Sequence, residues 1–299
     1  FSSHGFAQSM VPNYYQQADF LFSSPGAFQN GLLGFVNPAT SNYTHAPETH
    51  LYLSTENQNR TSVDRWGLFT GVPHLGFGVI HQDDVTDYRI NISGGNNAFA
   101  MGFGYGWSGG DAAKLMRENV FTVGTLIRPN PHVSLGMTGH FSTEGSDRSG
   151  ILDLAIRPFG TDLVTLFGDC AFGQKDNLND LLWSTGAVVR VLPGIHLTGR
   201  YFESEAFTLG FSFNFGYSGV SAQTRVPSGG DMDRLYYGFR SGGLKRNIID
   251  RFFMQNTKYV ATEMEGTVQY QKFRFFDEYK LTLSGILADL DAVISDGTV

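Results

Sequence analysis

AFAMGFGYGW, residues 98–107, alternates strictly with a period of two. One face carries large apolar residues, and the other carries only alanine and glycine. AFTLGFSFNFG, residues 206–216, repeats the pattern, with phenylalanine and leucine facing threonine, glycine, serine and asparagine. Successive side chains of a strand point to opposite faces of a sheet, so both stretches predict β-strands with one strongly apolar face.

The small-residue face of these segments indicates what surrounds the sheet. A soluble β-sandwich points its large residues inward and its charged residues outward. Here the second face is small, with isolated charges, and only 16% of the chain is charged while 14% is aromatic. This pattern favours a transmembrane barrel with the large residues against lipid and the small residues around the lumen. A soluble sandwich or propeller is the alternative.

Roughly fourteen segments of this kind fit between residues 49 and 242, joined by short Gly, Pro, Asn and Asp turns. We therefore predict an all-β fold, a transmembrane antiparallel β-barrel of about 14 strands, since lipid cannot satisfy an open sheet edge. Trp66, Trp107 and Trp183 are expected as interfacial anchors near strand ends. The longer connections 108–119 and 173–183 are candidate extracellular loops.

Charge and composition limit the partners and cofactors. The net charge of −7, without a Lys/Arg cluster, predicts no nucleic-acid partner. The scattered histidines and single Cys170 predict no metal, no cofactor and no disulfide framework. We expect outer-membrane lipid and lipopolysaccharide around a mature chain whose signal peptide has been removed.

The few luminal charges predict a structural network. Arg157, Arg200 and Arg240 would pair with Asp153 or Glu205 inside the barrel. A ring of charges that selects ions is the alternative.

The chain divides into three parts by its periodicity. Residues 1–48 lack the alternation and predict an N-terminal hatch inside the lumen, followed by the barrel at 49–242. Residues 243–299 form a periplasmic extension with a strand pattern and then a helical one. Strand and helix together predict the start of a βα unit, which cannot bury a core alone.

The stretch GLLGFVNPAT, residues 31–40, precedes the first predicted strand. Its glycines, Gly31 and Gly34, would allow close packing inside the barrel. A glycine-rich lead-in followed by Asn37, Pro38 and Ala39 resembles the FadL family of outer-membrane transporters. That resemblance implies a fourteen-stranded barrel, a hatch role for Asn37, Pro38 and Ala39, and passage of hydrophobic molecules. An ordinary turn in which proline fixes φ is the alternative for these three residues.

The C-terminal part resembles the start of the S49 peptidases, the signal peptide peptidase A family. The similarity rests on Glu265-Gly266-Thr267-Val268 and on the helical pattern of LSGILADLDAVISDGTV, residues 283–299. In that family the catalytic serine and lysine lie downstream of this region, so no catalytic residue is assigned here. The resemblance implies that a full-length product would be a serine peptidase.

Taken together, these features predict a bacterial outer-membrane barrel that anchors a periplasmic S49-like module. The first alternative is a FadL-like channel for a hydrophobic small molecule. The second is a structural subunit of an envelope complex, with a protein partner bound through residues 243–299.

Overall fold

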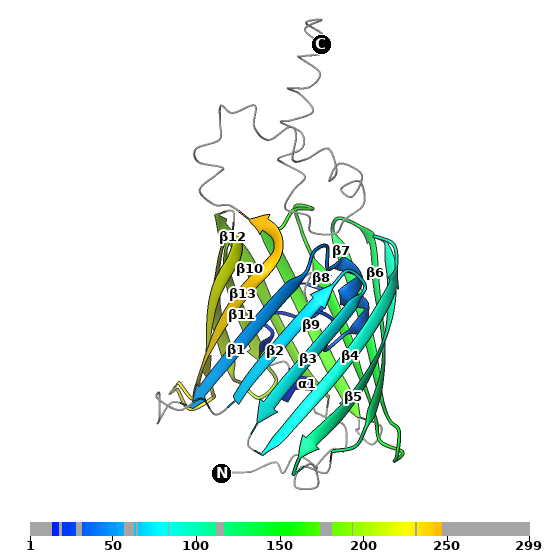
Figure 1. The fold of residues 1–299 in the computed structure, drawn as a ribbon. Helices are drawn as coiled ribbons and strands as arrows, with labels where there is room; N and C mark the ends of the chain where they lie inside the picture. Colours follow the sequence, from blue (N-terminus) through cyan, green and yellow to red (C-terminus); the bar gives the residue numbers. More distant parts are fainter. Residues whose placement is uncertain are drawn as a thin grey trace, which may run out of the picture.

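The computed structural model describes residues 14–17, 20–27, 32–56, 63, 65–82, 84–111, 117–173, 181–192, 194–230 and 232–246. They form a closed antiparallel β-barrel around a short N-terminal segment (Figure 1). The predicted fold class is therefore confirmed. The predicted βα extension and Gly31 lie outside the described residues.

Each strand pairs with its neighbours in sequence, and the first strand pairs with the last to close the ring. The strands are β1 (Glu48–Glu56), β2 (Arg65–Val72), β3 (Leu75–Gln82), β4 (Val85–Gly95), β5 (Phe99–Gly110), β6 (Val120–Asn130), β7 (Val133–Ser142), β8 (Arg148–Ile156), β9 (Val164–Gly173), β10 (Leu182–Leu192), β11 (Ile195–Phe202), β12 (Phe207–Val226) and β13 (Arg234–Arg246). The strand region thus begins at residue 48 and ends at residue 246, against predicted bounds of 49 and 242.

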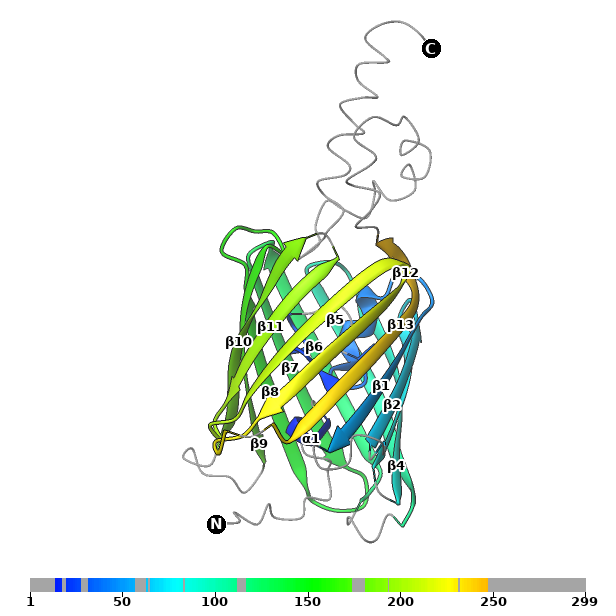
Figure 2. The same ribbon diagram turned by 90° about the vertical axis from the view of Figure 1, so that its left-hand side faces the viewer.

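The β12 strand runs from one rim of the barrel to the other and back again. Its first half pairs with β11 and its second half pairs with β13. A Cβ built on Gly210 would lie 3.4 Å from the carbonyl oxygen of Ala222, so the two halves lie side by side. Gly216, with φ of 55°, lies between them, and Figure 2 shows the ribbon bending back beside the β12 label. Thirteen strand elements therefore make fourteen passes, the even number that lets β1 and β13 pair antiparallel.

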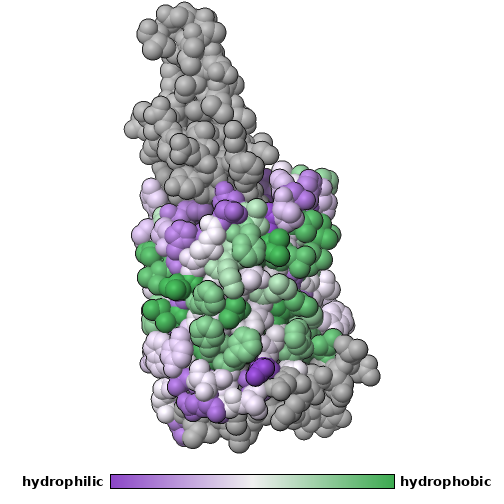
Figure 3. Space-filling model, turned by 90° about the vertical axis from the view of Figure 1, so that its right-hand side faces the viewer, coloured by the Kyte–Doolittle hydropathy of each residue, from purple (hydrophilic) through white to green (hydrophobic). Residues whose placement is uncertain are grey.

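The outside of the barrel is apolar and the inside is small and polar. The outward residues of 98–107 are 37 to 46% exposed, whereas Ala100 and the intervening glycines are buried. On the face shown in Figure 3, hydrophobic side chains form a band between two polar rims. A closed antiparallel ring with this exterior is the architecture of a transmembrane β-barrel.

The two rims of the barrel differ. At the rim where β1 begins, most connections are two or three residues long, such as 73–74, 131–132 and 193–194, and we call this the short-turn rim. The opposite rim carries longer connections, such as 57–64, 111–119 and 174–181, and we call it the long-loop rim. The two predicted extracellular loops both fall there.

The three tryptophans lie at strand ends beside the long-loop rim. Each has an aromatic neighbour on an adjacent strand, with ring centroids 5.4 to 6.1 Å apart: Trp66 stacks on His81, Trp107 stacks on Tyr88, and Trp183 lies at a tilt of 48° to Tyr201. This is the position expected of an interfacial aromatic belt. Within the described residues, no helix is long and apolar enough to cross a membrane.

The N-terminal segment lies inside the barrel. It contains the helix α1 (Tyr14–Gln17) and the 3-10 helix η2 (Pro38–Tyr43), both drawn in blue within the ring of strands in Figure 1. We call its described residues, 14–17, 20–27 and 32–43, the hatch. Phe20, Leu33 and Phe35 of the hatch pack against inward side chains such as Phe69 and Ile80 in one buried cluster. The hydrophobic core of this protein is therefore the interface between hatch and wall.

Candidate functional site

Asn37 attaches the hatch to the barrel wall near the short-turn rim. Its side-chain oxygen accepts a hydrogen bond from the Ala39 amide at 3.0 Å, which caps η2. Its side-chain nitrogen donates to the carbonyl oxygens of Thr125 on β6 and Met137 on β7, at 3.1 and 3.4 Å. Asn37 and Ala39 are fully buried. The asparagine therefore fastens helix and wall together and has no open face for a solute.

Wall glycines make room for this attachment. A Cβ on Gly102 would overlap the backbone of Pro38, and a Cβ on Gly124 would overlap the Asn37 side chain. A Cβ on Gly34 of the hatch, which has φ of 91°, would likewise overlap the side chain of Asn91 on β4. The small luminal face read from the sequence is thus matched to the hatch at these positions. Sequence reasoning anticipated the space around Gly34 but not which wall residues supply it.

Arginines of the wall cover aromatic rings of the hatch. The guanidinium carbons of Arg65, Arg89 and Arg128 lie over the rings of Phe20, Phe35 and Tyr43, at 5.0, 4.8 and 3.9 Å from the ring centroids. Arg89 also donates to the carbonyl oxygen of Phe35. Such stacking keeps a buried cation in favourable surroundings while it binds the hatch.

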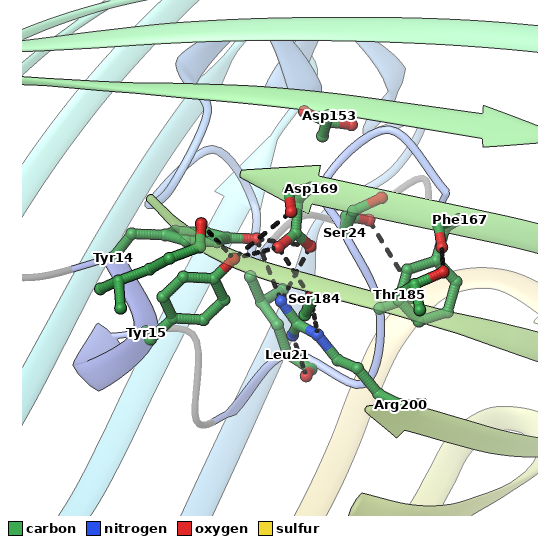
Figure 4. A network of polar contacts seen from close by, with 12 residues as sticks. Tyr14, Tyr15, Leu21, Ser24, Asp153, Phe167, Asp169, Ser184, Thr185 and Arg200 are labelled. Carbon is green, nitrogen blue, oxygen red and sulfur yellow. Dashed lines mark hydrogen bonds and ion pairs between the residues drawn. The ribbon is translucent and has the colours of Figure 1, made fainter. Parts of the chain in front are cut away.

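A second polar attachment surrounds α1 (Figure 4). Asp169 on β9 accepts hydrogen bonds from Tyr14 at 3.3 Å, Tyr15 at 2.6 Å and Ser184 at 2.7 Å. Arg200 on β11 forms a buried ion pair with Asp169 at 2.8 Å and also donates to the carbonyl oxygen of Leu21. Burial, strengthened by the nearby Asp169 carboxylate, raises the pKa of both tyrosines, so they stay neutral donors.

The predicted partners of Arg200 and Arg240 are wrong. Arg200 pairs with Asp169 and not with Asp153, because the sheet register places Asp169 beside Ser184 on the neighbouring strand. Asp153 instead accepts a hydrogen bond from the Gly26 amide of the hatch at 2.7 Å. The Arg157 side chain donates to Thr165.

The remaining two residues of the predicted network also have other partners. Arg240 pairs with Glu48, which lay just outside the predicted barrel. Glu205 lies in the turn after β11 and accepts a hydrogen bond from Ser228. Contacts between distant segments of this kind follow from register, which the sequence alone does not show.

On the side of β12, β13 and β1, the hatch leaves a cleft against the wall. The cleft encloses about 650 Å³ of empty space including its open mouth. The hatch residues Phe20, Leu21, Phe22 and Leu32 form its apolar side, and Ser23 of the hatch also lines it. The wall contributes His50 and Tyr52 of β1, Ser212, Asn214 and Ser221 of β12, and Arg240 of β13. Asn37, Pro38 and Ala39 do not line it, so the structure separates the predicted site residues from this cavity.

Fold and lumen together define a membrane barrel occupied by its own N-terminal segment. The described residues contain no group of three His, Cys, Asp or Glu side chains able to hold a metal ion. No family model and no curated protein matches the sequence.

Solved structures of other barrels are similar to this chain. They include the outer membrane protein Omp33 of Acinetobacter baumannii, at 6% identity and a TM-score of 0.49, covering 67% of this chain and 98% of that one. A porin mutant of Rhodopseudomonas blastica is similar at 8% identity and a TM-score of 0.42, covering 65% and 98%.

Proposed function

We propose that this chain is a bacterial outer-membrane barrel that passes a small, largely apolar molecule through a lumen gated by its hatch. The observation that carries this proposal is the cleft between the apolar hatch residues 20–22 and the β12–β13–β1 wall. Aqueous pores leave the lumen open for water and ions. Here the hatch fills much of it and is bonded to β4, β6, β7, β8 and β11. Passage therefore requires part of the hatch to move.

A disulfide across the hatch–wall interface tests this requirement. Ser41 of η2 and Ser93 of β4 have hydroxyl oxygens 2.8 Å apart, so Ser41→Cys with Ser93→Cys, in a Cys170→Ser background, should fasten η2 to the wall. Thr49→Cys with Thr70→Cys is the matched control, because those hydroxyls are 3.1 Å apart on two adjacent wall strands.

Uptake of a neutral apolar dye into proteoliposomes is the readout. We expect oxidation to slow uptake several-fold in the hatch-linked variant only, and reduction to restore it. Equal uptake by both oxidised variants would show that η2 need not move. Large steady ion conductance by the unmodified chain in a planar bilayer would favour an open pore instead.

The second candidate function is a membrane anchor for a periplasmic module. It is favoured by the position of the end of β13, which lies at the short-turn rim, since barrels of this class carry their short turns on the periplasmic side. The residues after β13, 247–299, would then continue into the periplasm as the predicted S49-like βα unit or as a docking segment for an envelope protein. Co-purification of one envelope protein at fixed stoichiometry, lost on deletion of residues 250–299, would support this role. Unchanged co-purification would count against it.

A further inference from the structure

The cleft contains a buried cationic group with an unused hydrogen-bond donor. Arg240 has 9% of its side chain exposed and lines the cleft. Its Nε donates to Glu48, and its Nη1 donates to the side-chain oxygen of Asn214 at 3.2 Å. Within the described residues, Nη2 is buried and has no partner. A buried donor without a partner is costly, so a ligand that supplies an acceptor would be stabilised there.

Two hydroxyls extend this donor set along the wall. Ser212 and Ser221 both line the cleft, on the two halves of β12, and no side-chain hydrogen bond within the described residues occupies either. The Glu48 carboxylate does not compete for a ligand, because it already accepts from both His50 and Arg240. The polar half of the cleft therefore offers donors and a cation, which match an oxygen anion and reject a metal ion.

The opposite half of the cleft is apolar. Phe20 and Leu21 are buried hatch residues, and Phe20 stacks on Tyr52 with ring centroids 5.7 Å apart and an interplanar angle of 26°. A flat apolar body can lie along such a surface while its polar end reaches the wall.

We propose that the cleft binds an organic carboxylate with a small apolar body, with its carboxylate on Arg240 and its body against the hatch. This inference rests on the proposed conduit function, because it names the solute that meets the hatch. A guanidinium is suited to a carboxylate through parallel N–H donors.

The test is the binding of 4-fluorobenzoate to the full chain in lipid nanodiscs, followed by fluorine NMR. Its uncharged analogue, 4-fluorobenzyl alcohol, is the comparison ligand. We expect Arg240→Gln to weaken binding of the carboxylate by about tenfold to a hundredfold, the range for a charge-assisted hydrogen bond. Arg190→Gln is the matched control, since Arg190 pairs with Asp162 away from the cleft residues.

A second variant tests the proposal even if Arg240→Gln does not fold. Ser212→Leu places a larger apolar side chain in the polar half of the cleft and leaves both residues of the Glu48–Arg240 pair in place. It should abolish binding while the heat-dependent gel shift of the folded barrel is retained. Equal affinity for the alcohol and the carboxylate, or unchanged binding by Ser212→Leu, would overturn the carboxylate assignment. Uptake of the neutral dye would persist in that case, so failure of this inference is distinguishable from failure of the conduit proposal.

Discussion

The hatch is held in two different ways on the two sides of the barrel. Along β4–β7 and β9–β11 it is fastened by Asn37, by Arg89 and by the Asp169–Arg200 pair, with wall glycines at the closest contacts. Along β12, β13 and β1 the wall instead presents serine, asparagine and arginine to a cleft. We call these the fastened side and the cleft side.

This difference indicates that the cleft is a binding site and not merely a gap left by imperfect packing of the hatch. On the fastened side, wall side chains bond the hatch directly: Asp153 accepts from the Gly26 amide, and Arg89 and Arg200 donate to the carbonyl oxygens of Phe35 and Leu21. On the cleft side the wall has kept polar groups that no hatch residue uses. The same type of substitution should therefore have different consequences on the two sides. On the fastened side it should lower the stability of the protein, and on the cleft side it should weaken the binding of the ligand.

The largest effect is expected from Arg200→Met. It leaves the Asp169 carboxylate buried without its cation, and breaking a buried ion pair costs about 3–5 kcal/mol. Urea unfolding in micelles measures the loss. Arg148→Met, at an exposed position, is the control and should stay within about 0.5 kcal/mol. A loss below about 1 kcal/mol would mean that the α1 contacts do not hold the hatch.

The next effect concerns the wall glycines. Gly102→Val places a side chain into the backbone of Pro38, and such overpacking costs about 1–3 kcal/mol. We expect η2 to be displaced, which protease cleavage within residues 36–47 would detect. Gly94→Val is the matched control, because nothing lies within 4 Å of a Cβ there. If both variants resist the protease equally, the glycines are not spacers for the hatch.

Removal of the Asn37 side chain should have a smaller effect. Asn37→Ala loses the cap on η2 and two hydrogen bonds to the wall, a cost of about 2 kcal/mol, part of which the helix recovers by shifting. Faster dye uptake should accompany this loss, since the hatch is released at one end. Asn42→Ala, which removes one hydrogen bond at 3.4 Å, should change neither the unfolding free energy nor the uptake. Slower uptake by Asn37→Ala would point to a transport role for the side chain itself.

The faces of the barrel wall were predictable from sequence, and the fastenings of the hatch were not. Alternation in residues 98–107 and 206–215 identified the outward residues, because period two is a local property of the chain. The hairpin at Gly216 hardly interrupts the alternation, so the two passes of β12 read as one segment in the sequence. The predicted number of about fourteen strands nevertheless agrees with the fourteen passes of the structure. Here the pattern is set by lipid on one side and the lumen on the other.

The ion pairs inside the lumen join residues that are far apart in the sequence, and the periodicity of a strand does not show which residues of different strands will meet. Asp169 and Arg200 are brought together by β10 between them, and Glu48 meets Arg240 only because the first and last strands close the ring. Asn37 was visible as a motif, but its two acceptors are backbone carbonyls, which any sequence supplies. The cleft left no local signal, since its lining comes from the hatch and from three strands.

A serine-to-alanine substitution can be made on both the fastened side and the cleft side, and it should change stability least. Ser41→Ala on the fastened side removes a fully buried hydroxyl that bonds to the Pro38 carbonyl and to Ser93, each at 2.8 Å, and should cost about 1–2 kcal/mol. Ser212→Ala on the cleft side should leave the unfolding free energy within about 0.5 kcal/mol, because the Ser212 hydroxyl makes no side-chain hydrogen bond within the described residues. It should instead weaken binding of 4-fluorobenzoate by a few-fold. Equal stability losses in the two variants would mean that Ser212 is structural and that the cleft closes in solution.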